Sequence, residues 1–421
     1  MTDAVAVSVI IPTHDRRDHL HRLLAALSGQ REGTPPFEVI VVADGCTDDT
    51  GPATRSLAVP YPLTVLEQEG LGAGNARNAG AGAARGHFLL FLDDDVEPGP
   101  DLIAEHVAAH RTALDRPRVV IGPYRLPESD GDGFYPTHVR TWWADLFSTM
   151  ARPGHRFAYR DILAGNLSLP VAVWRSVGGF DPAFRGCGGE DWELGVRLLA
   201  AGIEPHFASG AEAVHRVSGT GDVPASFARA LQEGVADVLI GSRHPALRPS
   251  LDLRHWTGVT RRLLPRLAVS WPAAGDPLAR SLARLLDPLE RVNARWPWRR
   301  LYAGLRWYWY WRGAAQRLGS SATMRRFLDA APPETSTPLR VDLSLGLEGA
   351  EERLEHERPA ALEISWRDRT LGAVATQPGA EPLRGRHLRP LLVERFAREL
   401  FDALDADGRL VRWLEGDRWD P

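Results

Sequence analysis

Three consecutive carboxylates, Asp93, Asp94 and Asp95, stand directly after the apolar run 87–92. A short apolar run bounded by polar residues is typical of a buried strand. Adjacent carboxylates repel one another unless a cation neutralises them, and ligands of open α/β sheets bind beyond the carboxyl ends of the strands. The triplet therefore predicts a divalent cation that joins these carboxylates to the phosphates of a ligand. Taken alone, it is also compatible with a solvated acidic turn.

A second acidic pair, Glu190-Asp191, precedes Trp192 and opens a predicted helix over 190–201. The positive end of a helix favours ionised carboxylates, and a general base must be ionised to take a proton from a hydroxyl. The pair therefore indicates a general base, with a helix cap that does no chemistry as the alternative. Trp192 is interpreted either as a stacking surface for a sugar ring or as a core residue.

Other polar residues follow the first two predicted strands. Pro12 and Thr13 end the first strand, where a backbone turn and a hydroxyl can meet a nucleobase. Asp44 ends the second strand and can accept from a base N–H or from ribose hydroxyls. Arg77, near the start of a helix, can pair with the base or the diphosphate, although a surface arginine is the simpler alternative.

The elements that must position these residues alternate between strand and helix. Strands are predicted over 5–11, 37–42, 63–66 and 88–92, and helices over 17–28 and 74–84. Residues 47–50 supply capping residues for a further helix between the second and third strands, weakened by Gly51-Pro52. This βαβαβαβ order predicts an α/β domain with a doubly wound, mostly parallel sheet. Further along, the patterns predict helices over 101–112 and 171–177, strands over 119–122, 161–169, 204–207 and 213–215, and a loop over 128–136.

Residues from about 250 to 328 carry helical patterns and seven of the 14 tryptophans. Between Arg291 and Arg326 there are nine arginines and no acidic residue, and the run 307–311 alternates Trp and Tyr. A packed helical subdomain, a membrane-surface segment and an acceptor groove are all compatible with this composition. Aromatic residues on every face of the helix give no amphipathic stripe for the membrane interpretation.

A Pro-rich stretch near residues 332–338 indicates a linker. Beyond it, strands are predicted over 339–347, 361–365 and 370–376, a helix over 388–404, and a final strand over 409–414. The expected organisation is a catalytic domain over 1–240, a helical Arg/aromatic-rich extension over 241–332, and a small α+β module over 335–421.

Composition limits the classes of function. The net charge of −4 argues against general nucleic-acid binding, and the absence of lysine from all 421 residues excludes Schiff-base chemistry and the Walker phosphate loop. Cys46 and Cys187 are the only cysteines, without zinc-ligand spacing. The start shows no signal peptide and no segment is long enough to span a membrane, so cytoplasmic residence is expected, with peripheral membrane contact left open.

Several of these motifs occur in a fixed order along the chain. They are the runs 7–13, 39–48, 74–80, 91–96, 178–181 and 188–193, followed by His215. In this order the chain resembles the family 2 glycosyltransferases with the GT-A fold, over about residues 5–216. The resemblance implies an inverting, metal-dependent enzyme that transfers a sugar from a nucleotide-diphosphate sugar to a hydroxyl-bearing acceptor.

The resemblance also implies roles for single residues on the metal side of the site. Asp95 would touch the cation directly, and His215 would be a further metal ligand. Asp93 is assigned both to the metal site and to donor binding, where it would serve the ribose or a metal-bound water. Imidazole as a ligand favours Mn²⁺ over Mg²⁺. Asp94 is assigned to donor binding, together with Asp15, which stands in the run 12–15 after the first strand.

On the acceptor side, the resemblance makes Asp191 the general base and lets Glu190 orient the acceptor. Asn166 stands where relatives line the donor-sugar pocket, with a polar turn residue as an equal alternative. The usual acidic pair after the second strand is reduced here to Ala43-Asp44, so a UDP-sugar is favoured but not fixed.

Two other functions compete with sugar transfer. A sugar-1-phosphate nucleotidyltransferase would share the α/β platform, but it usually has a Gly-rich loop with a basic residue where the run 12–15 stands. A catalytically inactive, nucleotide-sugar-binding scaffold would not need the intact carboxylates at Asp93, Asp95 and Asp191. The glycines at 70, 72 and 74 fail the G-x-G-x-x-G pattern of dinucleotide-binding loops.

Overall fold

The computed structural model describes residues 5–112, 116–127, 133–186, 188–216, 222–253, 263–329 and 336–409. The chain divides into two compact units. The first comprises Met1–Ser148 and Tyr159–Pro332, and the second comprises Thr149–Ala158 and Pro333–Pro421. The domain boundaries predicted at 240 and 335 stay predictions. The inclusion of the short segment Thr149–Ala158 in the second unit was not expected from the sequence.

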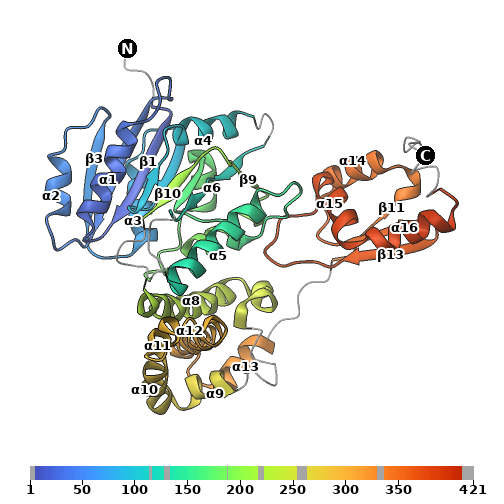
Figure 1. The fold of residues 1–421 in the computed structure, drawn as a ribbon. Coiled ribbons are helices and arrows are strands. Elements are labelled where there is room, and N and C mark those ends of the chain that lie inside the picture. Colours follow the sequence, from blue (N-terminus) through green and yellow to red (C-terminus); the bar gives the residue numbers. More distant parts are fainter. Residues whose placement is uncertain are drawn as a thin grey trace. The chain divides into compact units, whose positions relative to one another are not determined.

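The first unit is built on a seven-stranded sheet with the order β3-β2-β1-β4-β8-β6-β9 (Figure 1). β1 to β4 pair in parallel, whereas β8 runs antiparallel to both of its neighbours. The predicted α/β class with a mostly parallel sheet is confirmed. The strands span Val7–Thr13 (β1), Phe37–Asp44 (β2), Leu63–Gln68 (β3), Phe88–Leu92 (β4), Arg118–Ile121 (β6), Asn166–Pro170 (β8) and Glu204–Phe207 (β9).

The central strands are buried because their side chains are apolar on both faces. Every residue of β1 is buried, and in β2 and β4 only the first residue is partly exposed. Such continuous apolar runs are characteristic of strands that are covered on both sides. Each run ends at the same edge with a polar residue, so Thr13, Asp44 and Asp93 leave the sheet close to one another.

Helices between these strands follow the predicted pattern closely. In α1 (Arg17–Ser28) the four leucines on the predicted face are all buried. The ends of the predicted helices around the sheet coincide with the observed ends or differ from them by one residue. The other helices around the sheet are α2 (Thr50–Arg55), α3 (Ala73–Ala83), α4 (Leu102–Arg111), α6 (Val171–Val177) and α7 (Glu190–Ala200).

A second, three-stranded sheet lies next to the acidic triplet. It has the order β5-β10-β7, with β5 (Val96–Pro98), β7 (Tyr124–Arg125) and β10 (Ala213–His215). β10 runs antiparallel to β5 and pairs His215 with Val96. The sheet therefore brings a histidine that is distant in sequence to the residue that follows Asp95.

Two predicted elements between residues 128 and 169 are wrong in part. Residues 128–132 of the predicted loop lie outside the described residues, but 134–136 are the first turn of a long helix, α5 (Phe134–Met150). The predicted strand over 161–169 begins only at Asn166. Its first residue closes a 3₁₀ turn (Tyr159–Asp161), since the backbone N–H of Ile162 donates to Tyr159 O.

The rest of the first unit is helical, as predicted. It contains α8 (Val223–Arg243), α9 (Leu263–Ser270), α10 (Pro272–Ala283), α11 (Leu286–Arg291), α12 (Arg295–Leu318) and α13 (Ser321–Asp329), with the 3₁₀ helix η2 (Pro245–Ser250) after α8. The residue 240, predicted as the end of the catalytic domain, lies inside α8.

Helices α8 and α12 pack closely along their length (Figure 1). At their contact a Cβ on Gly234 would lie 2.0 Å from Tyr310 O, and one on Gly313 would lie 1.8 Å from Leu231 O. Five aromatic residues of α12 are buried in this core: Trp298, Tyr302, Tyr308, Tyr310 and Trp311. These contacts support the packed helical subdomain among the three interpretations of the Arg/aromatic segment, and the membrane-surface and acceptor-groove interpretations stay predictions. None of the described helices is long and apolar enough to cross a membrane.

The second unit has its own core around a three-stranded sheet, β11 (Leu339–Asp342), β12 (Leu362–Trp366) and β13 (Arg369–Val374). The first predicted strand, over 339–347, ends at Asp342: Leu343–Leu345 form a 3₁₀ helix, and Leu347 begins α14 (Leu347–Glu357). The predicted helix over 388–404 is two helices, α15 (Gly385–Arg395) and α16 (Ala397–Ala406), because Phe396 leaves the helical conformation at φ −124° and ψ 13°. Residues 410–414 of the predicted last strand lie outside the described residues.

The segment Thr149–Ala158 joins this second core through a buried carboxylate. Arg156 Nε donates to Glu381 O at 2.8 Å, and the backbone N–H of Phe157 donates to Glu381 Oε1 at 3.0 Å. Ala158 forms an isolated antiparallel bridge with Ala380. A short piece of chain from the middle of the sequence thus completes the C-terminal unit.

Candidate active site

The three carboxylates of the acidic triplet have different surroundings. Asp93 accepts from Arg77 at 2.5 Å, and its side chain is 36% exposed. Asp94 and Asp95 are buried, and both pair with the guanidinium of Arg16. Arg16 Nη1 lies 3.0 Å from Asp94 Oδ1 and 3.0 Å from Asp95 Oδ2. The triplet is therefore split between two arginines, one on each side.

Asp94 is held at the end of β1. The Thr13 hydroxyl donates to its Oδ2 at 2.8 Å, and Arg16 donates to its other oxygen. Burial raises the pKa of Asp94 to about 6, although the charge of Arg16 opposes the shift. The bond between Thr13 and Asp94 thus holds the end of β1 to the end of β4. The donor-binding roles predicted for Thr13, Asp94 and the buried Pro12 stay predictions.

Asp95 lies beside His215, as the pairing of β5 with β10 requires. His215 Nε2 is 3.4 Å from Asp95 Oδ1. Burial alone would raise the pKa of Asp95, but the hydrogen bond and charge of His215, together with Arg16, outweigh it and lower that pKa. The imidazole packs edge-on against Tyr124 and against Trp143 of α5.

These two residues fit a divalent cation. A carboxylate oxygen and an imidazole nitrogen stand side by side, and this donor set suits Mn²⁺. The buried Nδ1 of His215 has no hydrogen-bond partner among the described residues, so no second bond fixes the ring. Asp93 is turned to Arg77. Among the described residues, neither Asp93 nor the pair Asp95 and His215 belongs to a group of three ligand atoms. The geometry therefore gives no support to Asp93 as a direct metal ligand.

Arg77 connects the acidic triplet to the second acidic pair. Its guanidinium is 4% exposed and donates to Asp93 and, at 3.0 Å, to Glu190 Oε1. Burial would lower the pKa of Arg77, but the charges of Asp93 and Glu190 outweigh it and raise that pKa. Arg77 was predicted to contact the donor, whereas the structure engages it with protein carboxylates. Glu190 Oε2 is buried and lacks a partner within the described ranges.

Asp191 occupies the first turn of α7 next to this network. Its Oδ1 accepts from the backbone N–H of Trp192 at 2.8 Å, and its Oδ2 accepts from Ala164 at 3.4 Å. Burial and the charge of Glu190 raise the pKa of Asp191 to about 7, against the opposing charge of Arg77. The sequence predicted that the helix end would favour the ionised form. Here burial outweighs that effect.

The entry into α7 depends on a glycine. Gly189 has φ +90°, in the left-handed region, and a Cβ there would lie 2.4 Å from Ala236 Cβ. Because a side chain is excluded on both grounds, the turn can place Glu190 and Asp191 directly after it. The run of glycines before the acidic pair therefore has a structural reason.

Two residues predicted to touch the substrates have packing roles instead. Asn166 is fully buried: its amide donates to Pro123 O and Ala211 O, and its Oδ1 bonds to His106. All of its polar atoms are used inside the protein, so the structure does not support the donor-pocket role. Trp192 packs against the helical core, and the Arg160 guanidinium lies 4.6 Å from its ring centroid. This position corresponds to the core interpretation of Trp192.

Asp44 closes a loop at the end of β2. Its Oδ1 accepts from Gln68 Nε2 and from the backbone of Leu71, and its Oδ2 accepts from the backbone of Gly72. A carboxylate has about four lone-pair positions, so Oδ2 retains one for a further donor. The predicted contact with a base or ribose is compatible with this arrangement and stays a prediction.

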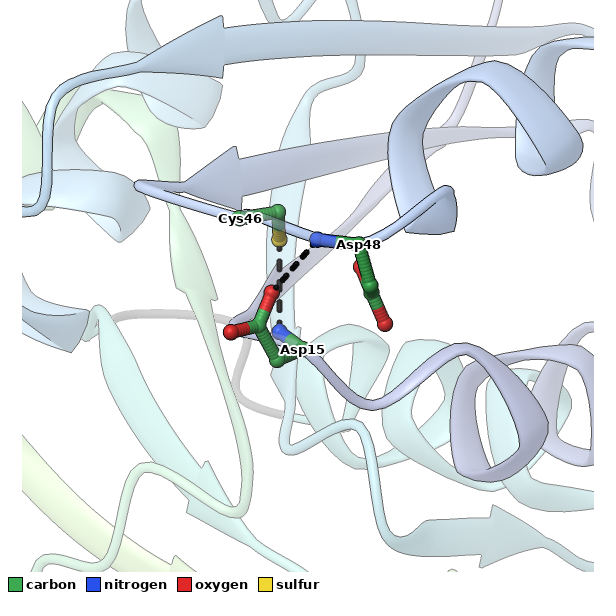
Figure 2. Close-up of side chains that lie close together, drawn as sticks. All are labelled: Asp15, Cys46 and Asp48. Carbon is green, nitrogen blue, oxygen red and sulfur yellow. Dashed lines mark hydrogen bonds between the residues drawn. The ribbon is translucent and has the colours of Figure 1, made fainter.

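Asp15 orders the loop that follows β2. Figure 2 shows its carboxylate turned toward the backbone nitrogen of Asp48, and it also accepts from the backbone of Thr47. Cys46 Sγ accepts from the backbone N–H of Asp15 at 3.4 Å. Asp15, Cys46 and Asp48 are close enough to offer three ligand atoms to an ion, but the Asp15 oxygens already serve the loop. The donor-binding role of Asp15 stays a prediction.

Arg16 is the site residue that sequence reasoning missed. It stands only three residues after the end of β1 and one residue before α1, and it carries the charge that neutralises Asp94 and Asp95. Its position on the same edge of the sheet as the triplet was the available signal. Adjacent carboxylates can be neutralised by an arginine of the protein as well as by a bound metal ion, and this possibility indicates Arg16.

Sequence comparisons match the amino-terminal part of the chain to known enzymes. Residues 8–163 match the model of glycosyl transferase family 2, and residues 144–222 match that of the N-terminal domain of galactosyltransferase. The validoxylamine A glucosyltransferase of Streptomyces hygroscopicus subsp. jinggangensis is 36% identical over 220 residues, which are 47% of this chain and 52% of that protein. The chain spans about half the length of the curated relatives that it matches.

A more distant relative and one solved structure extend the comparison. The hyaluronan synthase of Pasteurella multocida is 29% identical over 230 residues, covering 47% of this chain and 23% of that protein. The mannosyltransferase PcManGT from Pyrobaculum calidifontis, solved in complex with GDP-Man and Mn²⁺, superposes with a TM-score of 0.51. It is 20% identical and covers 75% of this chain and 87% of its own, so the likeness concerns the fold.

Proposed function

Because residues 8–163 match the model of glycosyl transferase family 2, we propose that the protein transfers a sugar from a nucleotide-diphosphate sugar to an acceptor hydroxyl, with inversion at the anomeric carbon. Its α/β fold is the GT-A fold that the ordered motifs predicted. One observation carries the proposal: Arg77 bonds both Asp93 and Glu190. The acidic triplet and the acidic pair therefore act as two sides of one site.

On the donor side, Asp95 and His215 would hold a divalent cation, with Mn²⁺ proposed over Mg²⁺ from the imidazole ligand. Such a cation, when bound, neutralises the charge that develops on the diphosphate leaving group. Asp44, at the carboxyl end of β2, would accept from the base or ribose through the free position on Oδ2. A UDP-sugar is the proposed donor.

On the acceptor side, Asp191 would take the proton from the attacking hydroxyl. A pKa of about 7 suits a general base, which works best when its pKa lies near the pH of the reaction. Glu190 would orient the acceptor through Oε2, while its other oxygen stays on Arg77. Attack from the face opposite to the diphosphate would invert the anomeric centre.

A panel of nucleotide-sugars, each assayed with Mn²⁺ and with excess EDTA, tests the proposal by release of the nucleotide diphosphate. We expect release that depends on the cation and an inverted product by NMR. Asp191→Asn should lower the rate by about 10²–10⁴ and leave nucleotide affinity nearly unchanged, because the amide cannot take the proton. Asp18→Asn, on the exposed side of α1, is the matched control. A product with retained configuration, or full activity in EDTA, would contradict the proposal.

A further inference from the structure

A pocket of about 540 Å³ opens among α5, α8 and α12 of the first unit. Pockets of this size are usual for small-molecule ligands. Its wall combines aromatic and charged side chains, among them Trp142, Tyr302, Trp307, Glu233, Asp252 and Arg306. None of these residues belongs to the metal and base machinery described above.

Two carboxylates of the wall, Glu233 and Asp252, are paired with arginines of the protein. Arg306 Nη2 donates to both oxygens of Glu233, at 2.8 and 2.5 Å, and Arg160 lies 3.3 Å from Asp252. A charged ligand would have to separate these pairs. A neutral ligand with several hydroxyls would instead find carboxylate lone pairs that accept and guanidinium N–H groups that donate. The wall therefore favours a neutral, polyhydroxylated ligand.

The aromatic part of the wall adds a surface for the apolar face of such a ligand. Trp142 is 50% exposed, although it is a large apolar side chain on a packed helix, and it contacts Trp143 edge-on. Tryptophan offers a broad apolar face with a polar N–H at its edge. A sugar ring, with hydroxyls around its rim and C–H groups on its face, matches this combination of surfaces.

A chain of contacts leads from the pocket wall toward the proposed general base. Tyr310, in the pocket wall, donates to Asp237 at 2.6 Å, and Arg160 bonds Asp237 as well as Asp252. The Arg160 guanidinium lies over Trp192, the residue after Asp191. Arg160 therefore contacts both Asp252 of the pocket wall and Trp192 in the first turn of α7.

We infer that this pocket is a sugar-binding subsite for the acceptor, which holds a neutral sugar unit beyond the hydroxyl that is glycosylated. The inference rests on the proposed function, because the pocket is assigned to the acceptor of that reaction. It specifies the substrate class: an acceptor that contains a neutral sugar or an equally hydroxylated ring.

Saturation-transfer NMR on the full chain tests the subsite, with methyl β-D-glucopyranoside, maltose and cellobiose as probes. We expect transfer to at least one probe. Trp142→Ala should weaken its binding about tenfold, since loss of an aromatic contact of this kind removes on the order of one factor of ten. Trp142→Tyr should restore most of it. Trp271→Ala, which truncates a 69% exposed tryptophan that is not part of the pocket wall, is the matched control.

Two further measurements separate this inference from the proposed function. Binding of UDP with Mn²⁺ should be the same in Trp142→Ala and in the unchanged protein, whereas transfer to a sugar-containing acceptor should show a raised KM at similar kcat. Absence of transfer to all three probes, or equal weakening by Trp271→Ala, overturns the subsite even when the enzyme is active. Failure of every nucleotide-sugar in the activity panel, with probe binding intact, overturns the proposed function instead.

Discussion

At the scale of single residues, neighbouring carboxylates have been given different properties by their partners. Burial raises the pKa of Asp94 to about 6, and His215 with Arg16 lowers that of the adjacent Asp95. At the other side of Arg77, Asp191 has a raised pKa of about 7. The residues proposed to hold a cation and to take a proton therefore differ in the direction of their pKa shifts, as their separate tasks require.

The raised pKa of Asp191 predicts the pH dependence of the reaction. A carboxyl whose folded pKa is raised is protonated below that value, and the protonated form is no base. We therefore expect kcat/KM to be level above about pH 7 and to fall about tenfold per pH unit below it. The pH profile of kcat/KM measures this directly.

Because the pKa of Asp191 is raised, a rise in pH makes the folded state less stable, whereas it makes the reaction faster. A raised carboxyl pKa favours the folded state below the unfolded pKa, and this contribution is lost as the pH rises through about 7. Asp191→Asn should therefore make the melting temperature less dependent on pH between about 4 and 7. A profile whose acid limb lies near pH 4, together with an unchanged pH dependence of melting, would contradict the shifted pKa.

Arg16 predicts an effect on metal affinity. Its guanidinium holds Asp94 and Asp95, so it competes with any cation that binds Asp95. Arg16→Gln should tighten the binding of Mn²⁺ alone, on the order of threefold to tenfold, as expected for the loss of one partly exposed ion pair. Titration of free Mn²⁺ by electron paramagnetic resonance measures it.

The matched control for this variant is Arg17→Gln. Arg17 is the next residue and pairs with the exposed Asp18 and Asp49, away from the triplet. Its removal should leave Mn²⁺ affinity unchanged. Equal or weaker binding in Arg16→Gln would mean that Arg16 supports the cation site and does not compete for it.

At the scale of elements, sequence reasoning worked where one local pattern decides the structure. The leucines of α1 and the buried runs of β1, β2 and β4 set the sheet that carries the site. It failed where distant residues decide: Phe396 ends a helix by packing over Gly372, and α5 begins inside a predicted loop. The candidate ligands were found from their spacing, whereas Arg16 and the burial of Asn166 depend on tertiary neighbours.

The close contact of α8 with α12 predicts a large effect from a small substitution. Gly313→Ala would place a Cβ 1.8 Å from a backbone oxygen, so the helices must separate. We expect a loss of about 1–3 kcal/mol in the free energy of unfolding. Gly82→Ala, in α3 with nothing within 4 Å, should gain about 0.4–1 kcal/mol, because alanine has fewer unfolded conformations. Urea denaturation of both variants checks the pair, and equal stabilities would contradict the packing argument.

At the scale of the whole molecule, the division into two units predicts the result of truncation. A chain ending at residue 333 keeps the site residues and the subsite, all of which lie in the first unit. We expect it to bind nucleotide and to hydrolyse the donor measurably. Because it exposes Phe157 and leaves Arg156 without Glu381, it should be less soluble than the full chain.

A substitution of Phe157, the apolar residue of the segment Thr149–Ala158 that the truncation exposes, is the control. Phe157→Ser in the truncated chain should recover solubility without changing nucleotide binding. Loss of nucleotide binding in both truncated forms would show that the second unit supports the site.

The segment Thr149–Ala158 also has a consequence for synthesis on the ribosome. Arg156 and Glu381 are separated by 225 residues, so translation must continue for roughly 10–50 s before the carboxylate that receives the segment exists. During that interval Phe157, which is 5% exposed in the folded protein, has none of its final neighbours from residues 333–421. The nascent chain therefore presents an exposed phenylalanine that a chaperone can bind, and the last fifth of the polypeptide must compete for it.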